Sequence, residues 1–77
     1  MKEYSYTIVL HPEPDEGGYS VTVPALPGCY AQGETVEEAI SKAREAIRLH
    51  IEGLLEDGEP VPEEEEHPQA ITIRVAA

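Results

Sequence analysis

The sequence contains no Trp, no Phe and only one cysteine, and these absences limit both its core and its chemistry. Aliphatic side chains and four tyrosines must build the core, because no other large aromatic side chain is available. A single thiol cannot form an internal disulfide, and the sequence has no cysteine spacing typical of a metal site. We therefore expect Cys29 to be a small buried hydrophobe.

Basic residues are also scarce, since five Lys and Arg residues oppose 16 Asp and Glu residues and give a formal net charge of −11. Proteins that bind DNA or RNA need cationic side chains to displace the counterions of the phosphates. Direct binding of nucleic acid is therefore not expected. An acidic surface accelerates association with a basic protein partner, although the same charge also serves solubility alone.

Long hydrophobic runs are missing as well. No 18 consecutive residues are apolar, and the first residues, MKEYSYTIVL, lack the apolar segment of a signal peptide. We expect a cytoplasmic protein that does not bind membranes.

The length of 77 residues predicts one domain, spanning residues 1–77. A chain of this size buries only about 60% of the surface that its unfolded form exposes. Small domains without disulfides or metals often bury more surface by self-association. The sequence therefore predicts a homo-oligomer, either a dimer or a tetramer.

Four segments have the pattern of strands. Residues 2–10 alternate with period two and place one set of side chains inward, namely Tyr4, Tyr6, Ile8 and Leu10. A loop rich in Pro and Gly follows at residues 11–18, and strands are predicted at residues 19–23 and 29–32 with the Pro24–Gly28 turn between them. Residues 69–77 alternate again and predict a fourth strand.

A helix is predicted from Val36 to Asp57. Thr35 and Glu38 form a capping box, in which each side chain binds the backbone N–H of the other residue. Apolar residues recur on one stripe of this helix, and Gly58 is a natural residue to follow its last turn. The fold class is therefore α+β with the order β-β-β-α-β. A right-handed crossover would give a four-stranded sheet of order 3-2-1-4, with strand 4 parallel to strand 1 and the helix on one face.

Catalysis is not predicted, despite the number of carboxylates. A two-metal hydrolase needs acidic residues that converge from strand centres, whereas the acidic residues here lie mainly in loops and on the helix surface. The three histidines are widely separated, and no glycine-rich phosphate loop precedes the helix. We expect no catalytic residues, no metal and no cofactor.

Residues 6–62 resemble the HicB-like antitoxin family. The resemblance rests on the motif Val-Pro-Ala-Leu-Pro-Gly-Cys at residues 23–29, followed by Gly-Glu-Thr at 33–35, Glu-Ala at 38–39 and Asp-Gly-Glu-Pro-Val-Pro at 57–62. It implies a degraded ribonuclease H-like fold without catalytic residues. It also implies the role of antitoxin toward a small basic HicA-like toxin that cleaves mRNA.

Many members of that family carry a DNA-binding segment after this domain, and the sequence predicts no C-terminal DNA-binding domain here. Two other functions stay open. One is a stand-alone oligomeric structural or regulatory protein without a toxin partner. The other is a residual metal-dependent hydrolase.

Most residues that carry the resemblance have structural reasons in turns and caps: Gly18, Pro24, Pro27, Gly28, Gly33, Thr35, Glu38, Ala39 and Gly58. Loop position and charge instead suggest the residues that contact a partner, and these are Asp15, Glu16, Tyr30, Gln32 and Glu34. A run of four acids, Glu63, Glu64, Glu65 and Glu66, is predicted to be a patch that steers a basic partner.

Overall fold

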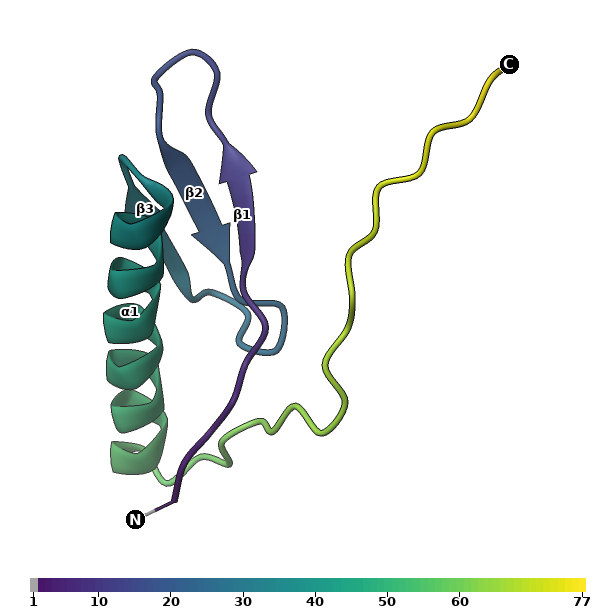
Figure 1. Ribbon diagram of the computed structural model, residues 1–77. Coiled ribbons are helices and arrows are strands. Elements are labelled where there is room, and N and C mark those ends of the chain that lie inside the picture. Colours follow the sequence, from purple (N-terminus) through teal and green to yellow (C-terminus); the bar gives the residue numbers. More distant parts are fainter. Residues whose placement is uncertain (1) are drawn as a thin grey trace.

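The computed structural model describes residues 2–77 and confirms the α+β class (Figure 1). In chain order the elements are β1 (Val9–Pro12), β2 (Tyr19–Thr22), β3 (Tyr30–Gly33) and α1 (Val36–Glu56). The three strands form one antiparallel sheet of order β1-β2-β3, and α1 lies on one face of it. Among the described residues, no helix combines the length and the apolarity needed to cross a membrane.

The register of the sheet brings apolar side chains together on the face that α1 covers. Leu10 is opposite Val21, and Val21 is opposite Ala31. Val21 is buried and packs with Ala39 and Ala43 of α1. Because side chains alternate along a strand, the other face of the sheet carries Ser20, Thr22, Tyr30 and Gln32.

Close packing of α1 on β3 depends on small residues. A Cβ atom added at Gly33 would lie 2.6 Å from Cα of Ala39, nearer than real Cβ atoms approach other backbone atoms. The alanines at positions 39 and 43 are almost completely buried at this contact. The helix can therefore approach the sheet at β3 as closely as its backbone allows.

The Pro24–Gly28 turn supplies a second part of the core. Backbone N–H groups of Leu26 and Cys29 donate to the carbonyls of Val23 and Leu26, and Gly28 has a positive φ of 88°. This tight path directs Leu26 inward, where it is 1% exposed, beside Val23 and Cys29. The partly buried residues that pack against this cluster are Tyr6, Ile8, Ala46 and Ile47.

The capping box forms at the start of α1, with one difference from the prediction. The N–H of Glu38 donates to Oγ1 of Thr35 over 3.1 Å, as expected. The Glu38 carboxylate accepts from the N–H of Glu34 over 2.9 Å, one residue before the cap. At the other end α1 stops at Glu56, and Gly58 follows with a positive φ of 69°.

The predicted fourth strand is not confirmed. Residues 69–77 are extended and exposed, and none of them pairs with β1 (Figure 1). The first strand is also shorter than the predicted residues 2–10. Its partner β2 ends at Thr22, two residues before Pro24, which has no N–H to donate to a ladder. The residues before Val9 are extended but lie outside the ladder.

Candidate functional site

Acidic side chains gather at the end of the molecule where the β1–β2 loop meets the start of α1. The loop is closed by hydrogen bonds from Glu13 N to Gly18 O and from Gly17 N to Glu13 O. Both glycines have positive φ values, near 80°. A Cβ atom at Gly18 would lie 3.1 Å from Cα of Glu34, so the loop lies directly against the segment that leads into α1.

This contact creates a depression of about 330 Å³, which we call the acidic pocket. Its lining residues are Glu13, Glu16, Gly17, Tyr19, Gln32, Gly33, Glu34 and Glu38. Four carboxylates therefore share one small concave surface. Like charges on one surface repel one another, and a cationic group from a partner would reduce that repulsion.

Within residues 2–77, no group of three or more His, Cys, Asp or Glu side chains is arranged to hold a metal ion. Cys29 lies elsewhere, in the core, where burial raises the pKa of its thiol. A raised pKa keeps the thiol protonated near neutral pH, and a protonated thiol is a poor nucleophile.

The structure brings together only some of the predicted partner-binding residues. Glu16, Gln32 and Glu34 line the acidic pocket, and Asp15 is exposed in the same loop. Tyr30 is 69% exposed, on the sheet face that α1 does not cover. The loop position of Asp15, Glu16 and Glu34 predicted their exposure, whereas the participation of Glu13 and Glu38 was missed. Glu38 was assigned only to capping, and nothing in its sequence spacing indicates that Glu13 lies near it.

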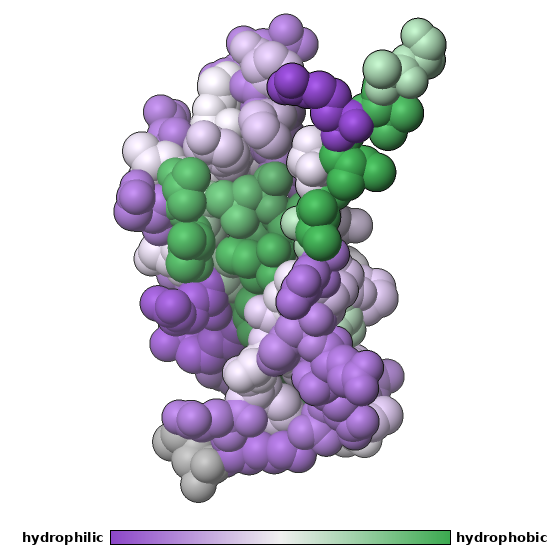
Figure 2. All heavy atoms as spheres, turned by 45° about the vertical axis from the view of Figure 1, so that its right-hand side comes forward, coloured by the Kyte–Doolittle hydropathy of each residue, from purple (hydrophilic) through white to green (hydrophobic). Residues whose placement is uncertain are grey.

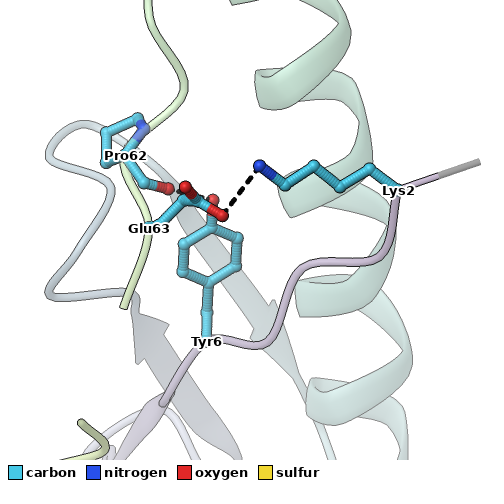
Figure 3. Close-up of polar contacts among 4 residues, drawn as sticks. All are labelled: Lys2, Tyr6, Pro62 and Glu63. Carbon is cyan, nitrogen blue, oxygen red and sulfur yellow. Dashed lines mark hydrogen bonds and ion pairs between the residues drawn. The ribbon is translucent and has the colours of Figure 1, made fainter. Parts of the chain in front are cut away.

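The other predicted patch, residues 63–66, lies away from the acidic pocket, beside the segment that leads into β1 (Figure 1). Figure 3 shows that Glu63 faces Lys2, with 2.9 Å between Nζ and Oε1, and that the Tyr6 hydroxyl donates to the carbonyl of Pro62. The hydrogen bond that the Lys2 ammonium donates to Glu63 raises the pKa of Lys2. These contacts fasten the chain after α1 to the N-terminal segment.

Glu64 contributes to the same attachment rather than to an exposed patch. Its Oε2 accepts a 2.6 Å hydrogen bond from the N–H of Thr7, and its Oε1 lies 3.3 Å from Nδ1 of His67. Hydrogen bonds from Thr7, and to a smaller degree from His67, lower the pKa of the Glu64 carboxyl. Of the four acids in the run, Glu65 and Glu66 are the two that are exposed without a polar contact found in the described residues.

Comparison with known protein families identifies the family of this chain. A family model described as the HicB_like antitoxin of bacterial toxin-antitoxin system matches residues 6–73. The chain belongs to the HicB-like antitoxin family. This membership confirms the resemblance read from the Pro24–Gly28 turn and the motifs around it.

Individual relatives of the family differ in how much longer they are than this chain. A UPF0150 protein of Synechocystis, ssr1765, is 46% identical over 94% of this chain and 90% of its own length. Antitoxin HicB of Escherichia coli K12 is 40% identical over 74% of this chain but only 41% of its own length. The chain thus corresponds to less than half of that antitoxin.

A solved structure supports the same family fold. The crystal structure of the N-terminal domain of Burkholderia pseudomallei antitoxin HicB matches with a TM-score of 0.65 and 42% sequence identity. The match covers 77% of this chain and 67% of that domain chain. The three-stranded sheet with one long helix is therefore an architecture shared within the family.

Proposed function

We propose that this chain is a non-catalytic antitoxin module that neutralises a small basic HicA-like toxin by direct protein–protein contact. Its membership of the HicB-like antitoxin family supports the general role. The acidic pocket carries the proposal for the contact itself, because four carboxylates at one end of the molecule suit a cationic surface. The complex would act in the cytoplasm, where a toxin that cleaves mRNA finds its substrate.

The net charge of −11 supports the same partner chemistry at longer range. Opposite net charges accelerate diffusional encounter between proteins, and the acceleration weakens as salt screens the charges. Asp15, Glu16 and Glu34 are exposed or line the acidic pocket, so they would make the first contacts. Tyr30 and Gln32 would extend the contact onto the open sheet face.

The decisive experiment mixes the full chain with the product of a small basic reading frame adjacent to its gene. We expect a complex that co-elutes in gel filtration and an RNA cleavage activity that falls as the chain is titrated in. Absence of any complex at micromolar concentration would overturn the proposal. A complex that leaves RNA cleavage intact would overturn neutralisation while retaining binding.

A second candidate function is a stand-alone oligomeric protein without a toxin partner. The exposed apolar side chains of residues 71–75 favour it, because a surface of this kind suits self-association. Absence of a basic neighbouring reading frame, together with stable oligomers of the chain alone, would favour this second function. The ribonuclease H-like arrangement, with its fourth strand, stays a prediction under either function.

A further inference from the structure

The C-terminal segment carries a row of exposed apolar side chains. Residues 69–77 leave the body of the molecule as an extended chain (Figure 1, yellow). Ile71, Ile73 and Val75 are each about three-quarters exposed, and they alternate with Thr72 and Arg74. In extended backbone this spacing puts the three apolar side chains on one side of the segment. We call residues 71–75 the tail strand.

A complementary apolar groove lies between α1 and the segment that leads into β1. The groove has a volume of about 340 Å³, and its apolar lining comes from Tyr6, Ile8, Ile40, Ala43 and Ile47, with Arg44 as the charged residue beside them. Because α1 packs mainly against β3 and β2, the helix covers the segment before β1 incompletely. Ile40, on the apolar stripe of α1, is consequently 38% exposed. Figure 2 shows apolar atoms gathered in this opening, with the apolar part of the C-terminal segment also in view.

The edge of the sheet beside the groove is unpaired. β1 is the outer strand in the order β1-β2-β3, so one row of its N–H and C=O groups has no strand partner among the described residues. An added strand at this edge would direct alternate side chains over the helix side of β1. The groove lies next to this position, along residues 4–8 just before β1, so an added strand that continues past Val9 would direct its side chains toward the groove.

From this complementarity we infer that two copies of the chain exchange their tail strands. The tail strand of each copy adds to the edge of β1 in the other copy, and its Ile71, Ile73 and Val75 enter the apolar groove of that copy. The exchange is reciprocal, so it closes as a two-fold symmetric dimer and leaves no tail strand unpaired. The inference concerns the chain alone and does not depend on a toxin.

The attachment at Glu64 is the reason to assign a second copy rather than the same chain. Glu64 accepts a hydrogen bond from the N–H of Thr7, so residue 64 lies beside residue 7. The residues after Glu64 then run in the same direction as β1. Two extended chains advance by about the same 3.3 Å per residue, so a straight continuation reaches the end of β1 at Pro12 before Ile71 arrives. The groove instead lies along residues 4–8, beside and behind this attachment. To fill its own groove, the tail strand would have to turn back.

Charge also suits docking of the segment onto a second copy. Residues 67–77 contain no Asp or Glu and include Arg74 and His67, whereas the rest of the chain is strongly acidic. Two acidic bodies repel each other, but the exchanged segments do not add to that repulsion. The tail strand is thus the part of the chain best suited to approach another copy.

Sedimentation equilibrium of the full chain tests the inference, with two variants matched in charge. We expect the wild type to be a dimer at micromolar concentration and Ile73→Lys to be a monomer, because Arg44 in the lining of the groove repels a second cation there. Thr72→Lys adds the same charge on the opposite side of the tail strand and should stay dimeric. A monomeric wild type, or equal weakening by the two variants, would overturn the exchange. Circular dichroism should give the same helix content for all three proteins.

Isotope-filtered NMR on a mixture of labelled and unlabelled chains identifies the occupant of the groove. We expect nuclear Overhauser contacts between the methyl groups of Ile73 in one chain and the ring of Tyr6 in another. Contacts confined to a single chain would mean that the segment folds back on its own sheet. Contacts that appear only after a toxin is added would assign the groove to the toxin complex. Either of these two results contradicts the exchange.

Discussion

The backbone N–H of Thr7 donates a hydrogen bond of 2.6 Å to the carboxylate of Glu64, which lies 57 residues further along the chain. Neither segment has regular secondary structure, so side-chain contacts hold them together. The ion pair of Lys2 with Glu63 and the hydrogen bond of Tyr6 to Pro62 lie at the same junction. The carboxylate of Glu64 is the least exposed of the charged groups that meet there.

Glu64→Gln should reduce the dependence of stability on pH. Hydrogen bonds from Thr7 hold the pKa of Glu64 below its ordinary value of 4.5 in the folded protein. The carboxylate therefore stabilises the fold fully above that ordinary value, and the stabilisation is lost as pH falls through the lower folded-state value. The melting temperature of the variant should lie below that of the wild type at pH 7, and the two should converge in acid.

The matched control for this experiment is Glu65→Gln, which removes the same charge from the exposed neighbouring residue. Its melting temperature should follow that of the wild type across the whole pH range. If Glu65→Gln and Glu64→Gln behave alike, the effect comes from net charge rather than from the hydrogen bond to Thr7. Thermal denaturation followed by circular dichroism measures all three proteins.

Gly33→Ala should destabilise the protein, whereas Gly53→Ala should stabilise it. A Cβ atom at Gly33 collides with the backbone of Ala39, so α1 would have to move from β3, at a cost of about 1–3 kcal/mol. Position 53 lies inside α1, and a Cβ atom there meets nothing within 4 Å. Alanine at that position should add about 0.5–1 kcal/mol through helix propensity. Urea denaturation measures both changes, and equal effects of the two substitutions would contradict the close packing.

The contrast between Thr35 and Gly18 illustrates what the sequence could predict. Thr35 and Glu38 are three residues apart, so their capping contact is local and the start of α1 followed from spacing alone. The approach of Gly18 to Glu34 is a tertiary contact, and it determines which carboxylates form the acidic pocket. Loop charges could therefore be named from the sequence, but their grouping could not.

The tail strand and Glu64 also show that the sequence pattern does not predict which distant segments pair. Alternation in residues 69–77 predicted a fourth strand that the described residues do not form, because a period of two carries no information about which strand edge will pair with it. Likewise, four consecutive acids predicted a solvated patch, although Glu63 and Glu64 contact Lys2 and Thr7. Pairings between distant segments depend on the whole fold, which short-range patterns do not encode.

Thr35→Ala should lower the free energy of unfolding by about 1 kcal/mol, because the N–H of Glu38 loses its acceptor at the start of α1. Thr35→Ser keeps a hydroxyl at this position and should stay close to the wild type. Thr72→Ala, in the exposed tail strand, is the control for loss of a threonine without a cap. Chemical denaturation distinguishes the three variants, and an unchanged Thr35→Ala protein would mean that the cap does not limit stability.

Neutralising the acidic pocket should weaken binding of a basic toxin more than neutralising distant charges does. One double variant combines Glu16→Gln and Glu34→Gln, and the other combines Glu65→Gln and Glu66→Gln. Each therefore loses two negative charges, and the two proteins are compared. Both should slow association several-fold at low salt, since both reduce the long-range attraction. At physiological salt the screening length is about 8 Å, and only charges in direct contact with the toxin keep their effect.

The dissociation rate separates contact from steering in this comparison. Loss of Glu16 and Glu34 should accelerate dissociation at every salt concentration, because they line the surface proposed to hold the toxin. Loss of Glu65 and Glu66 should leave dissociation unchanged. Surface plasmon resonance with immobilised toxin measures both rates. Equal dissociation rates for the two double variants would exclude the acidic pocket as the contact surface, and thermal melting of each variant would establish that the difference does not arise from unfolding.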